Sequence, residues 1–134
     1  MKVADRADPA PGPKQILVRV KACSINYRDL LMVQGFYNPK QPLPLVPFSD
    51  GAGEVVAVGE GVTRFKVGDR VANCFFQGWD AGKPSPEKVA TTAMGSPLDG
   101  MLRELAVLEE DGAVHLPDHL SYEEGATLPC AGLT

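Results

Sequence analysis

The sequence predicts a mainly β fold, a small and partly open β-barrel with a few short helices. Glycines at positions 51, 53, 59, 61 and 68 interrupt two valine-rich runs, Val55 to Val58 and Val67 to Val71. Glycine beside β-branched residues is typical of strands that bend or bulge sharply and then turn tightly. Ahead of these runs, Ile16, Val18 and Val20 alternate with longer or charged residues, which predicts a half-buried strand.

The N-terminal part of the chain also predicts an arm and one short helix. Residues 1–14 carry prolines at positions 9, 11 and 13, so we expect an extended arm. Either Asn26 or Ser24 can cap a helix over residues 27–34, because both side chains can accept a hydrogen bond from its first turn. Gly35 is the expected end of that helix.

The C-terminal half is expected to contain a long loop, a strand and a second helix. About 25 residues between Phe76 and Gly100 show no strong period, and a loop of that length is commonly functional or mobile. A strand is expected over residues 101–108. Ser121 is followed three residues later by Glu124, a capping box that predicts a helix from this point.

Composition restricts the classes of function. The 134 residues suffice for one domain, and the net charge of −4 without a basic stripe argues against nucleic acid or an anionic membrane as a partner. Apolar runs are too short to cross a membrane. The N-terminus lacks an apolar signal core, so we expect a cytoplasmic protein. Three widely spaced cysteines suggest neither a disulfide framework nor a cysteine-rich zinc site.

Three pieces of the sequence, in order, resemble one family. They are ILVRVKACSINYRDL, PLPLVPFSDGAGEVVAVGEGVTRFKVGDRVA and DGMLRELAVLEEDGAVHLPDHLSYEEGATLPCAGLT. Together they are similar to the N-terminal GroES-like domain of the medium-chain dehydrogenase/reductases, which include zinc-type alcohol dehydrogenase-like and quinone oxidoreductase-like proteins. The resemblance implies a GroES-like barrel over residues 15–134 that ends at the hinge to a Rossmann domain. It also implies NADP or NAD as the cofactor, bound mainly by that domain, which this chain lacks.

The resemblance further shows where a catalytic zinc would bind. Zinc-type relatives hold the metal with a cysteine and a His-Glu pair, and the corresponding positions here are Asn26, Ser49 and Asp50. Catalytic zinc needs three good protein ligands, and asparagine and serine are poor ones. Residues 76–100, where relatives carry a four-cysteine structural site, contain no cysteine. We therefore expect a zinc-free member with no metal site.

In a zinc-free member, hydrogen-bond donors must stabilise the charge that zinc would stabilise. N-x-x-D followed by Q-G-x-Y resembles zinc-free quinone oxidoreductases and 2-enoyl thioester reductases. This resemblance implies that Tyr37 is a proton donor or oxyanion stabiliser, and that Asn26 and Tyr27 orient substrate or nicotinamide. The alternative for Tyr37 is that its ring only packs, at the rim of the site, beside Phe36 and the proline-rich segment. Ser49 either donates a hydrogen bond into the same pocket or fills the space left by the metal. Thr134 matches a hinge threonine that touches the nicotinamide end of the cofactor.

Three functions stay open. The first is the substrate-side domain of a zinc-independent NAD(P)H-dependent oxidoreductase that reduces a quinone, enone, enoyl thioester or aldehyde. The second is an alcohol dehydrogenase-like protein that interconverts alcohols and aldehydes, and the third is a non-catalytic GroES-like binding or assembly module. Without a cofactor domain, we expect the fragment alone to be inactive. Unpaired strand edges and uncovered apolar surface favour a homo-oligomer such as a dimer.

Overall fold

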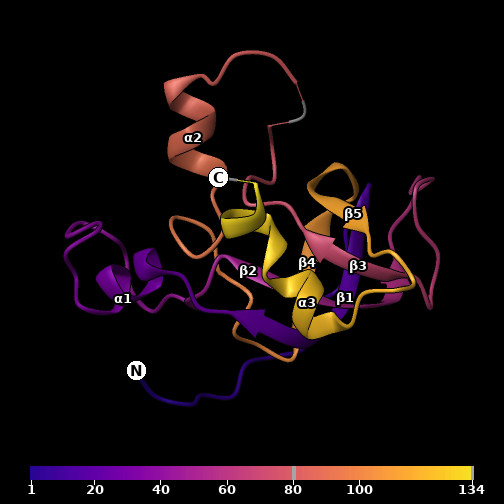
Figure 1. Cartoon of the computed structure of the whole chain (residues 1–134), viewed down its shortest axis with the longest axis horizontal. Helices are drawn as coiled ribbons and strands as arrows, with labels where there is room; N and C mark the ends of the chain where they lie inside the picture. The colour runs from indigo at the N-terminus through magenta and orange to yellow at the C-terminus, as the bar shows by residue number, and fades with distance from the viewer. Residues whose placement is uncertain (80, 134) are drawn as a thin grey trace.

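A computed structural model describes residues 1–79 and 81–133 of the chain, which form one curled antiparallel sheet with short helices around it (Figure 1). The strands are β1 (Gln15–Ser24), β2 (Asp50–Val58), β3 (Arg70–Asn73), β4 (Leu105–Glu109) and β5 (Ala113–His115). The helices are α1 (Tyr27–Val33), α2 (Pro86–Thr92) and α3 (Tyr122–Ala126), with a 3₁₀ turn η1 (Glu110–Gly112) and a π-type turn η2 (Leu128–Gly132). The predicted mainly β class is confirmed.

The order of the strands explains why the sheet closes partway into a barrel. The order is β4-β1-β2-β3-β5, so β4 and β5 lie at opposite edges although only η1 separates them in sequence. The sheet must therefore curl until its two edges approach each other. Gln77 bridges β4 and the turn that leads into β5, because its Oε1 accepts from the Glu109 backbone N–H at 3.0 Å and its Nε2 donates to the Gly112 carbonyl at 2.9 Å.

The predicted bulges occur where β1 pairs with β2. The pairing shifts register twice along β1, which adds curvature to both strands. Gly53 lies in the curved part of β2, where a Cβ atom would come within 2.2 Å of the Arg19 carbonyl oxygen. Glycine is thus the residue that lets the two backbones approach this closely.

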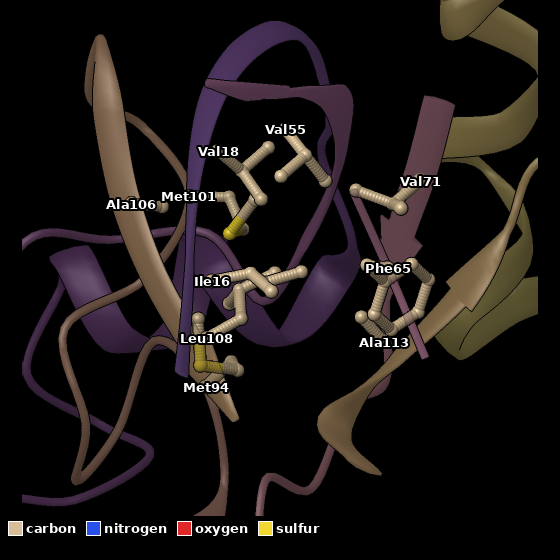
Figure 2. Close-up of a cluster of buried hydrophobic side chains, with 10 residues drawn as sticks. All are labelled: Ile16, Val18, Val55, Phe65, Val71, Met94, Met101, Ala106, Leu108 and Ala113. Carbon is tan, nitrogen blue, oxygen red and sulfur yellow. The ribbon is translucent and has the colours of Figure 1, made fainter. Parts of the chain in front are cut away.

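Apolar side chains of β1, β2 and β4 point into the curl and form the core (Figure 2). Ile16 and Val18 of β1 are fully buried, as the period-two pattern predicts, whereas Val20 is partly buried and Arg19 is exposed. Burial of each large core side chain contributes roughly 1.5–3 kcal/mol. The core residues are Ile16, Val18, Val55, Phe65, Val71, Met94, Met101, Ala106, Leu108 and Ala113. Small residues pack α3 against the sheet in a second cluster, Ala52, Ala72 and Ala126.

Both capping predictions are confirmed. Asn26 is the N-cap of α1, and Gly35 follows this helix with a φ of +77°. At α3, the Ser121 N–H donates to Glu124 Oε2 at 2.8 Å, and the Glu124 N–H donates to Ser121 Oγ at 3.1 Å. These caps are local, so the sequence alone could identify them.

Two predicted strands begin later than expected. Val67 lies in a turn, where Gly68 has a φ of +92° and the Lys66 N–H donates to the Asp69 carboxylate at 3.0 Å. β3 therefore starts only at Arg70. β4 starts at Leu105 rather than at residue 101, because the ladder with β1 covers only residues 105–109; the Val20 N–H also donates to the Glu104 carbonyl at 2.9 Å, just before it.

The predicted long loop between residues 76 and 100 contains a helix. α2 begins after Ser85, whose side chain accepts from the Lys88 N–H at 3.1 Å, and Pro86 occupies the first turn. A serine cap followed by proline is a helix-start signal that the absence of an apolar stripe obscured. No residue of α2 is buried, and Figure 1 shows this helix projecting from the sheet.

The expected arm, residues 1–14, carries no helix or strand. Two ion pairs tie it to the rest of the described chain: Arg6 Nη1 lies 2.6 Å from Asp99 Oδ2, and Lys14 Nζ lies 3.0 Å from Glu110 Oε1. Within the described ranges, no helix is both long enough and apolar enough to cross a bilayer.

Acid is expected to destabilise this fold through Glu110, a carboxylate buried at the junction of β4 and β5. Glu110 Oε2 accepts from the Thr63 and Arg64 N–H groups at 2.9 and 3.1 Å, and Lys14 Nζ lies 3.0 Å from Oε1. These hydrogen bonds lower the pKa of Glu110 from 4.5 to about 2. Because the folded pKa is the lower one, ionised Glu110 stabilises the fold above pH 4.5, and this stability is lost as the pH falls toward 2.

Urea unfolding at pH 7, 4 and 2.5 measures this dependence. Glu110→Gln should lower stability at pH 7 and flatten its decline with acid, whereas the control Glu60→Gln, at an exposed position, should change neither. Equal pH profiles for the wild type and Glu110→Gln would contradict the assignment.

Candidate functional site

The candidate site lies where α1 begins and where the chain enters β2. At the start of α1, the Asn26 N–H donates to Asp29 Oδ2 at 2.8 Å, so Asp29 caps the helix from inside. Asp29 is only 1% exposed. Burial raises its pKa, and the Asn26 N–H and the charge of Arg28 oppose that rise. Asp29 is therefore a structural carboxylate at the start of α1.

At the start of β2, Ser49 and Asp50 are both fully buried. Ser49 Oγ donates to Asp50 Oδ1 at 2.6 Å, and Asp50 Oδ2 accepts from the Cys130 N–H at 2.9 Å. Asn73, at the end of β3, donates from Nδ2 to the Ser49 carbonyl and accepts at Oδ1 from the Gly51 N–H, both at 2.8 Å. Every polar atom of the Asp50 carboxylate thus has a protein partner.

Asp29 connects these two segments. The backbone of Ser49 and the charge of Asp50 both act on the pKa of Asp29, so the beginning of α1 adjoins the beginning of β2. The structure therefore brings Asn26 and Ser49 to the same region, on either side of Asp29. The Asn26 amide nitrogen Nδ2 is buried and has no hydrogen-bond partner among the described residues. An orphaned buried donor of this kind is available to a ligand.

The two candidate tyrosines lie in different surroundings. Tyr37 is 51% exposed, and its ring centroid is 4.8 Å from the guanidinium carbon of Arg28. Its backbone N–H donates to the Leu31 carbonyl at 3.2 Å, which ties it to the end of α1. Tyr27 is 76% exposed. Thr134, the predicted cofactor contact, lies outside the described residues.

The surface around α1, beside the candidate site, is apolar. Two hollows, of about 450 and 240 Å³, lie elsewhere on the described surface, and neither is lined by a candidate site residue. Large apolar side chains instead stand exposed around α1 and the segment after it. They are Ile25, Tyr27, Leu30, Val33, Phe36, Tyr37 and Leu43. Exposed apolar residues gathered on one segment indicate a surface that another molecule or domain covers.

The Cys23 thiol near this site is expected to be unreactive. Its Sγ donates to the Met101 carbonyl at 3.0 Å, and burial, followed by the charge of Asp29, raises the pKa of Cys23 from 9.0 to about 11. Because the thiolate is the reactive form, its alkylation at pH 8 should be about 100-fold slower than that of an ordinary thiol. Iodoacetamide labelling followed by peptide mass spectrometry measures the rate. Cys23 should label at the ordinary rate in 8 M urea, and fast labelling of the folded chain would contradict this prediction.

Sequence reasoning missed two residues that organise the site. It assigned no role to Arg28, and it did not consider Asn73. The signal for Asn73 was a buried-strand pattern, Val71 and Ala72, that ends on an amide. No local signal identifies the aromatic and carbonyl partners of Arg28, because they lie nine to 68 positions away.

Residues 12–118 match the family model of the alcohol dehydrogenase GroES-like domain. A zinc-type alcohol dehydrogenase-like protein of Schizosaccharomyces pombe is 45% identical over 123 residues, which cover 92% of this chain and 35% of the relative. The quinone oxidoreductase of Pseudomonas aeruginosa is 41% identical over 124 residues, 92% of this chain and 31% of the relative.

Solved structures have the same fold. A Sinorhizobium meliloti 1021 protein, provisionally classed as an alcohol dehydrogenase, superposes with a TM-score of 0.86 at 43% identity. The match covers 99% of this chain and 40% of that protein. The chain thus spans about a third of the length of the two curated relatives above.

Proposed function

Because the chain belongs to the medium-chain dehydrogenase/reductase superfamily, as an alcohol dehydrogenase GroES-like domain, we propose that it forms the substrate side of a zinc-independent oxidoreductase. The substrate is a carbonyl or activated alkene: a quinone, enone, enoyl thioester or aldehyde. The reductant is NADPH or NADH, held mainly by a second domain. A cytoplasmic location and assembly into a homodimer belong to the same proposal, and sedimentation measures the assembly.

The observation that carries the proposal is the hydrogen-bonding of the residues at the zinc positions. Zinc-type relatives would use three ligands here, but Asp50 already accepts from Ser49 Oγ at 2.6 Å and from the Cys130 N–H at 2.9 Å. Asn26 presents an unpartnered N–H donor, which repels a cation. Among the described residues, no group of three or more histidine, cysteine, aspartate or glutamate side chains is placed to hold a metal. This donor set does not fit zinc, although the Schizosaccharomyces pombe relative is named zinc-type.

Neutral donors then have to stabilise the charge that develops during reduction. Hydride addition to a carbonyl or conjugated alkene builds negative charge on the substrate oxygen, and preorganised hydrogen-bond donors stabilise such charge strongly. Two donors at this site are available to a ligand: the orphaned Asn26 Nδ2 and the Tyr37 hydroxyl, which makes no hydrogen bond within the described part of the chain. We assign Asn26 to orient the substrate or the nicotinamide amide, and Tyr37 to donate the proton.

The nicotinamide cofactor supplies the hydride when it is bound. The orphaned Asn26 donor fits a carboxamide or carbonyl acceptor, so Asn26 is the described residue that we assign to this end of the cofactor. Thr134 keeps its proposed role at the hinge. The exposed apolar residues around α1 form the wall that, with the second domain, excludes water from the reacting atoms. Ser49 is assigned a supporting role, because its hydroxyl is committed to Asp50.

Activity of the product of the complete coding sequence tests the proposal. The purified protein is assayed for NADPH and NADH oxidation with a quinone, an enone, an enoyl thioester and an aldehyde, before and after treatment with a zinc chelator. We expect turnover of at least one acceptor, substoichiometric zinc by mass spectrometry of metals, and no loss on chelation. The 134-residue chain alone should show no turnover. Stoichiometric zinc with activity on alcohols would favour the alcohol dehydrogenase alternative, and inactivity with every acceptor would favour the binding module.

A further inference from the structure

Arg28 is the most constrained cation near the candidate site. Its side chain is 10% exposed, and its guanidinium carbon lies 4.8 Å from the Tyr37 ring centroid and 4.9 Å from the Phe75 ring centroid. The two rings come from different segments, one after α1 and one after β3. A guanidinium plane stacks on aromatic rings in this way, whereas a lysine ammonium offers only a point charge.

Two of the three guanidinium nitrogens of Arg28 are fixed as well, whereas Nε is buried without a hydrogen-bond partner among the described residues. Nη1 donates to the Met94 carbonyl at 3.1 Å, and Nη2 donates to the Ser96 carbonyl at 3.0 Å. These two acceptors lie just beyond α2, so a single side chain joins α1 to the end of the long 76–100 segment. Asp29 Oδ1, at 3.9 Å from Nη1, balances the charge. Arg28 is thus held from several sides and cannot move independently of its neighbours.

Tyr37, by contrast, has little backbone support. The segment between α1 and β2 contains no helix or strand, and the hydrogen bond of the Tyr37 N–H to Leu31 fixes the backbone but not the ring. The contact with Arg28 holds the ring, and the hydroxyl stays available for a ligand. We propose that Arg28 is a positioning residue that holds Tyr37 over the site through its guanidinium plane.

This inference rests on the proposed function for its catalytic consequence, but its structural part can be tested separately. Aromatic rings shift the NMR resonances of protons stacked on their faces upfield. In the 134-residue chain, the Arg28 side-chain protons should therefore resonate upfield of their ordinary positions. Tyr37→Phe keeps the ring and should preserve the shift, whereas Tyr37→Leu should move the resonances back in part. Unchanged Arg28 resonances in Tyr37→Leu would overturn the proposal.

The catalytic part is tested in the product of the complete coding sequence with Arg28→Lys. This variant keeps the positive charge but loses the planar guanidinium that stacks on the rings and the donation from two separate nitrogens. Because misplacing a reacting group by about 1 Å costs about 100-fold in rate, kcat should fall by about that factor while KM changes little. The matched control is Arg64→Lys, which changes another arginine stacked on an aromatic ring, Phe65, away from the site; its kcat should stay at the wild-type value.

A double variant separates positioning from a general loss of structure. If Arg28 acts through Tyr37, then Arg28→Lys combined with Tyr37→Phe should be no slower than Tyr37→Phe alone. Additive losses, or a fall in kcat that accompanies a collapsed NMR spectrum, would overturn the positioning role. If the wild type turns over none of the four acceptors, the proposed function fails, and the Arg28 resonances alone decide whether Arg28 holds Tyr37.

Discussion

Tyr37→Phe in the product of the complete coding sequence is expected to lower kcat by about 10²–10⁴-fold, the range for loss of a general acid. The phenyl ring retains the contact with Arg28, so the variant removes only the hydroxyl and leaves the loop in place. KM should change little, because the lost interaction forms in the transition state rather than in the substrate complex. Steady-state kinetics with the best acceptor of the panel measures both constants.

The matched control is Tyr122→Phe. Tyr122 lies on α3, and its ring centroid is 4.7 Å from the guanidinium carbon of Arg70. Its hydroxyl has no assigned role, and kcat should be unchanged. If Tyr37→Phe turns over at the wild-type rate while Tyr27→Phe is slow, the proton donor is Tyr27 and the assignment made from the Q-G-x-Y pattern is wrong. If neither variant is slow, the donor is a group other than the tyrosines of α1 and its following segment.

The elements predicted correctly depend on contacts between near neighbours in sequence. The caps at Asn26 and Ser121 and the alternating burial of Ile16 and Val18 all follow from side chains within four positions of each other. The pattern of glycine beside valine predicted the bulges between β1 and β2, because a glycine such as Gly53 leaves room for the opposite backbone. In each case the physical cause and the sequence signal are the same residues.

Predictions failed where a tight turn, an unburied helix or a distant partner decides the structure. Val67 reads as a strand residue, but the turn at Gly68 and Asp69 prevents it from pairing. α2 has no apolar stripe because no residue of it is buried, so periodicity could not identify it. The partners of Arg28, which include Phe75, lie on segments that only the folded chain brings together. The arrangement around Tyr37 therefore required the structure, although the resemblance had already selected that residue.

Asn73→Ala is expected to destabilise the chain by about 3–5 kcal/mol, the largest effect on stability that we predict for a single polar residue. Asn73 is 2% exposed, and its amide donates to the Ser49 and Cys74 carbonyls at 2.8 and 3.0 Å and accepts from the Gly51 N–H at 2.8 Å. Truncation removes about 1 kcal/mol for each bond and leaves a buried N–H without a partner. Urea denaturation at pH 7, followed by circular dichroism, measures the loss.

The control makes the same substitution at a partly exposed asparagine. Within the described part of the chain, the Asn38 side chain bonds only inside its own turn: Nδ2 donates to Gln41 Oε1 at 3.3 Å, and Oδ1 accepts from the Lys40 N–H at 3.2 Å. Asn38→Ala should therefore cost less than about 1 kcal/mol. Asn73→Asp separates the two functions of the amide, because it keeps the acceptor for Gly51 and replaces the donor with an oxygen. That oxygen would face two carbonyl oxygens, and the loss should be comparable to that of Asn73→Ala. Equal stability of the position-73 and position-38 alanine variants would contradict the view that Asn73 holds the entry of β2, and with it Ser49, in place.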